Sequence, residues 1–585
     1  MFLKKSTTTI RGKTYNNYKI VESYREGGNV KHRILFPLGA LTEEQAEQLR
    51  LVVSAHSNPD VVVAKSDQIV VTKHAGFLAV ATLHHFWEEW GFADFFRMDR
   101  WVEAMVLNRC LEPVTKIKIK EWMAETVLPA YLEVDPHKVD EFDVYRSLDD
   151  LAKREKELQV FLYQQLQAKQ SFSGYFFYDL TSTYLEGSRC LIAKLGYSRD
   201  HRPDCEQIVI ALMVTPEGYP FHWQVLEGNT QDVTTIEQLI WEVNSQYHLQ
   251  HCTLVFDRGM VSANNLISLE AASWNYVSAL DRDEIVNVGF LEGALPEPAS
   301  LYDWEQVMTM REFVPFDEDQ LLFYREFTKE ERRYVLTFDV ARFLEEYRSL
   351  KRRLNQAITW LEQKNKALAQ AKKARNQEIL TRELETMLKR KRVKRLLKVC
   401  LEPREGKVTN ARGKERIVHT FQFAYAVNEE ERQKEQRLHG LTCFVTNLPA
   451  QKASAQEVIS WYRRKNKVEE AFREIKSYLE LRPIYLTRTE RVRAHVSICI
   501  LAYFLYNEME RHFREKGLAE SPPEVLARLQ KCQVNRLEFK TQHRSKLSIT
   551  EPSEQQKEYL QVLGCENILA PQEVKQVLKK IENWL

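Results

Sequence analysis

The sequence predicts a multidomain α/β protein built around a mixed β-sheet, and three observations lead to that prediction. At 585 residues the chain is too long for one compact core. Strand-like and helix-like periodicities alternate between residues 171 and 283. Helical patterns precede this region, and a long segment rich in lysine and arginine follows it. We therefore expect several structural units, of which one contains the sheet.

The region before residue 171 is expected to be a small β unit followed by helices. Residues 8–40 alternate in hydrophobicity, and Gly27-Gly28 separates two strand-like halves. This pattern predicts an antiparallel β unit over residues 1–45. Helical periodicity over residues 46–170 predicts five or six helices without catalytic motifs.

The region 171–283 predicts the core of the protein. Three strand-like segments joined by turn residues are followed by a helix, a strand, a helix and a strand. This β-β-β-α-β-α-β order matches the ribonuclease H-like fold, in which the first strand lies beside the fourth. The predicted segments, in chain order, are GYFFYDLTSTYLEG, EQIVIALMVTPEGYP, FHWQVLEGN, VTTIEQLIWEVNSQY, CTLVFD, SANNLISLEAAS and NYVSAL.

Residues 284–450 are expected to form an insertion domain that interrupts this core. Its first part is strand-like and acidic, and its middle, about 341–399, predicts a basic helical hairpin or coiled coil. Residues 351–400 contain 16 Lys or Arg and 4 Glu, whereas residues 291–330 contain 10 acids and 3 bases. The hairpin could clamp a polyanion or mediate oligomerisation, and a solvated helix face is the simpler reading.

The core is expected to resume over residues 451–515, and residues 516–585 are expected to be helical. A single helix is predicted from residue 454 to 481. At about 100° per residue its apolar side chains fall on one arc and its polar ones on the next. The alternative is an ordinary surface of i,i+4 salt bridges. The apolar arc contains Trp461, Val468, Phe472, Ile475 and Leu479, and the polar arc contains Tyr462, Lys465, Glu469, Arg473 and Lys476.

Three separated carboxylates, Asp179, Asp257 and Glu469, are the candidate catalytic residues. Asp179 and Asp257 lie in apolar runs that predict buried strands, where an ion is costly unless a cation neutralises it. The predicted strand order places these two side by side. Glu469 lies on the basic helix, which suggests a polyanionic substrate.

The spacing along this helix resembles a known signature. Tyr462, Lys465, Glu469 and Lys476 resemble the Tyr-x2-Arg-x3-Glu-x6-Lys signature of insertion-sequence DDE transposases of the IS-four superfamily. Lys465 stands where that signature has Arg, which retains the charge but not a bidentate grip on phosphate.

Other segments resemble the same family over about residues 175–506. Asp179 in DLTSTYLEG is similar to the family's first Asp strand, and Asp257 followed by Arg258 is similar to the second. Further similar positions are Gly228, Asn229 and Asp232 before a helix, and His495 on the helix after the Glu.

The resemblance implies a transposase that cleaves DNA strands and transfers them. Asp179, Asp257 and Glu469 would bind two Mg²⁺ or Mn²⁺ ions, which prefer such oxygen ligands. The implied partners are double-stranded DNA, as terminal inverted repeats and target, and a second copy in a homodimer on DNA. Residues 46–170 would serve DNA binding or dimerisation. The implied DNA contacts are Tyr462, Lys465, Arg473, Lys476 and Arg258.

Four other residues have a simpler reading. Glu186 and Asp281 are more often solvated or capping carboxylates than metal ligands, and Asp232 is expected to cap the helix after it. His495 on an apolar helix is more often a core histidine than a substrate contact.

Several classes of protein are not favoured by the sequence. No run of about 18 apolar residues and no signal peptide is visible, so we expect a cytoplasmic protein with no membrane contact, associated with the bacterial nucleoid. The nine cysteines contain no CxxC pair, so no zinc site is expected. The alternatives are a domesticated relative that binds DNA as a regulator without cutting it, and a coiled-coil scaffold with incidental acids.

Overall fold

The computed structural model divides the chain into two compact units. Unit 1 comprises residues 1–143 and 512–585, and unit 2 comprises residues 144–511. The predicted boundary at 170/171 lies outside the described residues. The structure describes residues 1–585 except 11–12, 57, 59–60, 139, 170–173, 187–188, 250, 296–302, 317–318, 410–413, 541–543, 583 and 585.

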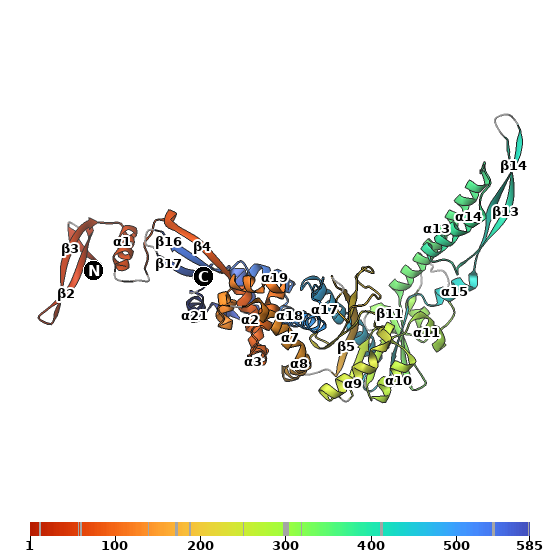
Figure 1. The fold of residues 1–585 in the computed structure, drawn as a ribbon, viewed down its shortest axis with the longest axis horizontal. Coiled ribbons are helices and arrows are strands. Elements are labelled where there is room, and N and C mark those ends of the chain that lie inside the picture. Colours follow the sequence, from red (N-terminus) through yellow and green to blue (C-terminus); the bar gives the residue numbers. More distant parts are fainter. Residues whose placement is uncertain are drawn as a thin grey trace. The chain divides into compact units, whose positions relative to one another are not determined.

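Unit 2 contains a nine-stranded mixed sheet, of which β5 and β11 are labelled in Figure 1, and its strand order is β10-β11-β12-β15-β9-β8-β5-β6-β7. Its strands are β5 (Tyr175–Tyr184), β6 (Gln207–Val214), β7 (Pro220–Glu227), β8 (Thr253–Phe256), β9 (Asn275–Ala279), β10 (Val314–Phe316), β11 (Asp319–Lys329), β12 (Arg332–Asp339) and β15 (Leu441–Thr446).

The centre of the sheet confirms the predicted mixed order. β5, β6 and β7 are antiparallel neighbours, whereas β5, β8 and β9 run parallel. Helices α9 (Ile236–Tyr247) and α10 (Ala263–Ala271) connect the parallel strands. β6 is buried along its whole length, which explains its continuous apolar run. The prediction of a turn between β5 and β6 is wrong, because β5 ends at Tyr184 and β6 begins only at Gln207.

The predicted insertion is part of this sheet and not a separate body beside it. β12 pairs with both β11 and β15, and β15 pairs with β9. β10, β11, β12 and β15 all come from residues 284–450, so the insertion extends the core sheet. β10, β11 and β15 lie in segments that were expected to be strand-like, whereas β12 and the pairing of β15 with β9 were not predicted. Helices α11 (Arg282–Val288), α12 (Trp304–Thr309) and α15 (Glu429–Arg437) lie in the same stretch.

The middle of the insertion forms a helical hairpin that packs on a β-hairpin. α13 (Val340–Ala369) and α14 (Gln377–Lys391) are followed by the antiparallel pair β13 (Leu397–Thr409) and β14 (Glu415–Val427). The predicted break at 373–377 is confirmed by the start of α14, whose cap is Asn376. The two helices were predicted, and so was strand patterning over residues 419–428, which overlaps β14, but β13 was not.

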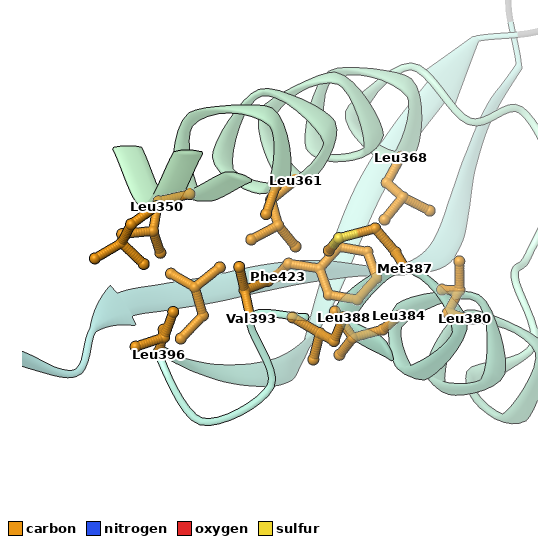
Figure 2. Close-up of a cluster of buried hydrophobic side chains, with 13 residues drawn as sticks. Leu350, Leu361, Leu368, Leu380, Leu384, Met387, Leu388, Val393, Leu396 and Phe423 are labelled. Atoms are coloured by element: carbon orange, nitrogen blue, oxygen red, sulfur yellow. The ribbon is translucent and has the colours of Figure 1, made fainter. Parts of the chain in front are cut away.

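Leucines of both helices form a core with Phe423 of β14 (Figure 2). Asn365 pins the strand to α13 by two hydrogen bonds with the backbone of Phe423, at 2.9 and 2.8 Å. The core contains Leu350, Leu354, Ala357, Leu361, Leu368, Leu380, Leu384, Met387, Leu388, Val393, Leu396, Leu397 and Phe423.

The prediction of one helix over residues 454–481 is wrong, because the helix is broken at Lys465. α16 (Ala455–Arg464) and α17 (Asn466–Ser477) meet there, and both pack on strands of the sheet. The N–H of Val468 donates to the carbonyl of Lys465 at 3.1 Å, a tight 3₁₀-type turn. The long helix α18 (Thr489–Lys516) follows.

Unit 1 contains two small sheets. β1 (Phe2–Ile10), β2 (Lys13–Glu26) and β3 (Asn29–Ala40) form an antiparallel sheet, as predicted for residues 1–45. Glycines 27 and 28 have positive φ angles of 57° and 83° at its β2–β3 turn. The second sheet contains β4 (Ile69–Gly76), β16 (Gln533–Phe539) and β17 (Arg544–Ile549).

The second sheet corrects two predictions, since 46–170 and 516–585 were both expected to be helical. β4 pairs antiparallel with β16, so a strand from residues 46–170 and one from residues 516–585 share a sheet. The remaining helices are α1 (Glu43–Ala55), α2 (Leu78–Glu89), α3 (Phe92–Phe95), α4 (Trp101–Leu111), α5 (Ile119–Ala124), α6 (Leu128–Leu132), α7 (Glu141–Lys153), α8 (Glu155–Lys169), α19 (Pro522–Leu529), α20 (Glu554–Val562) and α21 (Pro571–Ile581).

Candidate active site

Asp179 lies on β5, and Asp257 directly follows the neighbouring parallel strand β8. Tyr178 of β5 is paired in register with Phe256 of β8, so the next residues on both strands are the two aspartates. Asp257 is the first residue after β8 and its carboxylate accepts a hydrogen bond from the N–H of Gly259 at 3.4 Å. The apolar strands therefore position two carboxylates at one point of the sheet.

Lys465 lies between the carboxylates of Asp257 and Glu469. Its Nζ is 2.8 Å from Glu469 Oε1 and 3.3 Å from Asp257 Oδ1. The lysine side chain is 5% exposed, whereas those of Asp257 and Glu469 are 41% and 56% exposed. The break between α16 and α17 thus places a buried ammonium among acids that solvent can reach.

The charges of this cluster depend on one another. Burial raises the pKa of Asp179 to about 6, although the positive charge of Lys465 opposes that rise. Burial acts in the same direction on Asp257, but Lys465 and the N–H of Gly259 outweigh it and lower its pKa. Burial disfavours the ammonium of Lys465, yet the charge of Asp179 and the Glu469 hydrogen bond raise the lysine pKa. Lys465 is therefore the cation that holds the acids together.

Two aromatic side chains fix α16 beside the same strands. The hydroxyl of Tyr462 donates to Asp257 Oδ1 at 3.4 Å, and its ring contacts Phe444 of β15. Burial raises the pKa of Tyr462 to about 12, so the hydroxyl stays a donor. Trp461 stacks on Tyr175 of β5 with ring centroids 4.5 Å apart. Tyr462 thus contacts a carboxylate directly, in addition to anchoring the helix.

The other predicted DNA-contacting residues differ in exposure. Arg258 and Arg473 are exposed. The Lys476 side chain is only 10% exposed, and its Nζ donates to Asp200 Oδ1 at 3.0 Å and to the Ser182 carbonyl at 2.5 Å. Burial lowers the pKa of Lys476 despite the charge of Asp200. Lys476 is therefore bound within the protein, where it ties α17 to β5.

Three of the four residues for which a structural role was the simpler interpretation have such a role in the structure. Asp281 caps α11 in a capping box with Glu284, as expected. Glu186 lies 3.9 Å from Arg202, and the buried His495 has its Nε2 3.2 Å from the Leu481 carbonyl. Both observations agree with solvated and core roles.

Asp232 does not cap the helix that follows it. Its carboxylate accepts from Arg199 Nη2 at 2.6 Å, and no side-chain cap is formed at the start of α9. A Cβ on Gly259 would be 3.9 Å from Asp232 Oδ2 and 3.8 Å from Asp257 Oδ2. Asp232 is therefore a further acid near the candidate site that the prediction treated as structural. The segment LEGNTQD was the signal that could have indicated it.

The donor set fits a hard divalent cation in its chemistry. All three candidate ligands are carboxylates, and two of them already share a cation in the ammonium of Lys465. Over the described residues no group of three or more His, Cys, Asp or Glu side chains is arranged to hold a metal ion. The ammonium of Lys465 thus supplies the positive charge next to these carboxylates.

No helix in the described part of the chain is long and apolar enough to span a membrane.

The chain matches two family models. Residues 179–505 match the model described as "Transposase DDE domain". Residues 3–60 match the "IS1634 family transposase, N-terminal domain". No curated protein matches the chain.

The chain also has distant structural similarity to solved transposase complexes. One is the "piggyBac transposase synaptic complex with hairpin DNA", at 9% identity and a TM-score of 0.33, covering 83% of this chain and 76% of that chain. Another is the "Mos1 transposase paired-end complex with left transposon end", at 12% identity and a TM-score of 0.14, covering 41% and 69%. The "Mos1 mariner paired end complex with Mn" has 12% identity and a TM-score of 0.13, covering 40% and 68%.

Proposed function

This chain belongs to the family of transposases with a DDE domain, and we propose that Asp179, Asp257 and Glu469 are the carboxylates that give its site the DNA-cleaving activity. It is an insertion-sequence transposase, an enzyme that hydrolyses and transfers DNA strands. The observation that carries the proposal is the placement of two aspartates on adjacent parallel strands with Glu469 bound through Lys465 to one of them. The IS-four subtype stays a prediction.

The strand order around these residues supports a ribonuclease H-like core. Three antiparallel strands are followed by two parallel ones on the other side of β5. In this arrangement the ends of β5 and β8 meet, which gathers acids from distant parts of the chain. The six sequence segments, with boundaries at 45, 170, 283, 450 and 515, remain our proposed division of the chain, in which segment 284–450 contributes strands to the core sheet and segments 46–170 and 516–585 share a second sheet.

Divalent metal would be held by Asp179, Asp257 and Glu469, and we propose two ions, Mg²⁺ or Mn²⁺. When bound, such ions activate a water or a DNA 3′-hydroxyl and stabilise the leaving oxygen. Asp179 suits this role because burial raises its pKa to about 6, which means that its negative charge is unfavourable in this environment. A bound cation would neutralise that charge. Lys465 and Tyr462 orient Asp257 and Glu469 through the contacts described above.

The proposed substrates are the terminal inverted repeats of the element and its target DNA. Exposed Arg258 and Arg473 are the candidates for phosphate contact beside the carboxylates. Tyr462, Lys465 and Lys476 would join them only by exchanging their present partners. Because two ends must be brought together, we propose that the enzyme works as a homodimer on DNA, in the cytoplasm at the nucleoid.

Conservative substitutions test the proposal. Asp179→Asn, Asp257→Asn and Glu469→Gln should each abolish Mg²⁺-dependent nicking of DNA that carries the repeats flanking the gene. The matched control is Glu470→Gln on the same helix, which loses only its pair with Lys467. Because the three acids act as a unit, a double variant should be no worse than a single one.

Binding measured in EDTA separates chemistry from recognition. The three variants should retain affinity for the repeat DNA while losing cleavage. Wild-type nicking by Glu469→Gln would refute its role. Binding without any cleavage by the wild-type protein would instead favour the alternative of a non-cutting regulatory relative.

A further inference from the structure

A cationic groove runs between α13 and α14 of the insertion. Two adjoining clefts of about 630 and 440 Å³ share Trp360, Met387 and Arg390 along the two helices. Among the described residues that line them, Glu383 is the single acid. We name this surface the hairpin groove, and its cationic side chains are Arg348, Lys351, Arg352, Lys364, Arg382, Arg390 and Lys391.

Four arginines of the hairpin groove present free guanidinium groups to solvent. Arg348, Arg352, Arg382 and Arg390 are exposed, and across the described residues their guanidinium groups form no hydrogen bond or ion pair. The neighbouring Arg353 differs, because its Nη2 is 2.6 Å from Glu435. Like charges one helical turn apart, as at 348 and 352, destabilise a helix by a few tenths of a kcal/mol. The groove therefore carries charge that the protein itself does not neutralise.

The apolar surface of the two helices is already used within the protein. Leu361 and Leu368 of α13 face Phe423 and the side chains of α14, and Leu350 lies at the end of the cluster with Val393 and Leu396 (Figure 2). At about 100° per residue, the groove residues of α13 are centred roughly half a turn from these leucines. A homodimer interface would need a large apolar centre, and among the described residues that line the groove only Trp360, Ile379 and Met387 are apolar, whereas the others are charged or polar. This observation disfavours oligomerisation through the groove.

We propose that the hairpin groove binds the phosphate backbone of double-stranded DNA without reading its sequence. From Arg348 to Lys364 the cations extend over about 24 Å at about 1.5 Å per residue. A duplex presents about 14 phosphate charges over that length, at one per about 1.7 Å. Asn355, Thr359 and Gln363 lie between the cations and can donate further hydrogen bonds to phosphate oxygens.

The inference depends on the family's DNA substrate and does not depend on which carboxylates cut it. It assigns a second DNA contact to a part of the chain outside the candidate active site. The enzyme would thereby hold duplex at the insertion while the carboxylates engage a strand elsewhere.

The test measures binding of the full-length protein to a random-sequence duplex of about 30 base pairs in EDTA, across a series of KCl concentrations. The groove variant is Arg352→Gln with Arg390→Gln. Two lost phosphate contacts should reduce the slope of log K against log salt by about 1.8, at about 0.9 per contact. Affinity at low salt should weaken more than about tenfold.

A matched control removes the same charge elsewhere in the insertion. Arg404→Gln with Arg416→Gln changes two exposed arginines of the β13–β14 hairpin, outside the groove. The control should keep the wild-type slope, and the charge-retaining pair Arg352→Lys with Arg390→Lys should keep it too. Circular dichroism verifies that all variants are folded.

Three outcomes would overturn the proposal. One is an unchanged slope in the groove variant, and another is an equal loss in groove variant and control. The third is that the groove variant, in sedimentation without DNA, is a monomer where the wild type is an oligomer, while its slope of log K against log salt is unchanged. This result would make the groove an interface between copies of the chain. Since no cleavage is measured, failure of the catalytic assignment would leave these results interpretable.

Discussion

Replacing Lys465 with methionine is expected to destabilise unit 2 when no divalent metal is present. Methionine keeps the length of the side chain but removes the ammonium 2.8 Å from Glu469 and 3.3 Å from Asp257. Removing one partner of a buried ion pair costs about 3–5 kcal/mol. The two acids are 56% and 41% exposed, so water recovers part of this loss. We therefore expect a decrease of about 2 kcal/mol in the free energy of unfolding.

Divalent metal should reverse this loss, because it would supply the missing positive charge. A ligand at about 100 times its dissociation constant adds about 2.7 kcal/mol to the folded state. Urea unfolding followed by tryptophan fluorescence, in EDTA and in saturating Mg²⁺, should show a larger gain from Mg²⁺ in Lys465→Met than in the wild type.

The matched control is Lys467→Met on the same helix. Its side chain is 26% exposed, against 5% for Lys465, and its Nζ pairs with Glu470 at 2.7 Å, so its loss should be below about 1 kcal/mol and insensitive to Mg²⁺. The reasoning is refuted if Lys465→Met is as stable as the wild type in EDTA, or if Mg²⁺ stabilises both proteins equally.

Two further predictions concern Asp179 of β5 and Lys476 of α17. Because burial raises the pKa of Asp179 to about 6, above about 3.9 in the unfolded chain, its stabilising contribution is present below about pH 4 and is lost as the pH rises through about 6. Asp179→Asn should then be more stable than the wild type at pH 8 in EDTA, by up to about 3 kcal/mol, with no gain at pH 4; a pH-independent difference in urea unfolding would contradict this. Lys476→Met should cost about 3 kcal/mol by leaving Asp200 buried with less compensation, and adding Asp200→Asn should recover part of it. Unchanged urea unfolding of Lys476→Met would show that the pair does not stabilise α17 on β5.

The parts of the fold that follow from local periodicity could be predicted from the sequence. The alternation of strands and helices from β5 to β9 and the helical hairpin of the insertion are encoded within short windows. The pairing of β15 with β9 and of β4 with β16 could not be predicted in this way. The latter joins Gly76 to Gln533, a sequence separation that no local pattern spans. β4 is also exposed at most of its positions, so it lacks the alternation of a half-buried strand.

The candidate site was likewise predictable from the sequence only in part. The acids Asp179, Asp257 and Glu469 were recognisable from their local settings, and strand order explained the proximity of the first two. Periodicity placed Lys465 on the same arc as Glu469, but a continuous helix gave no reason for its burial. At the helix break Lys465 pairs with Asp257, which is far away in the sequence, and the Asp232 pair with Arg199 involves a long loop. Neither leaves a periodic trace in the sequence.

The helical hairpin, with β13, β14 and α15, leaves the sheet and returns to it at one place. The N–H of Asp339, at the end of β12, donates to the carbonyl of Gly440 at 2.9 Å, just before β15 begins. Phe338 and Leu441 are then paired as antiparallel neighbours. In topological terms, residues 340–439 replace the turn of an ordinary β-hairpin. A segment attached in this way can lengthen, shorten or change its surface charge without altering the register of β12 and β15, so the hairpin groove can evolve independently of the sheet that positions the carboxylates.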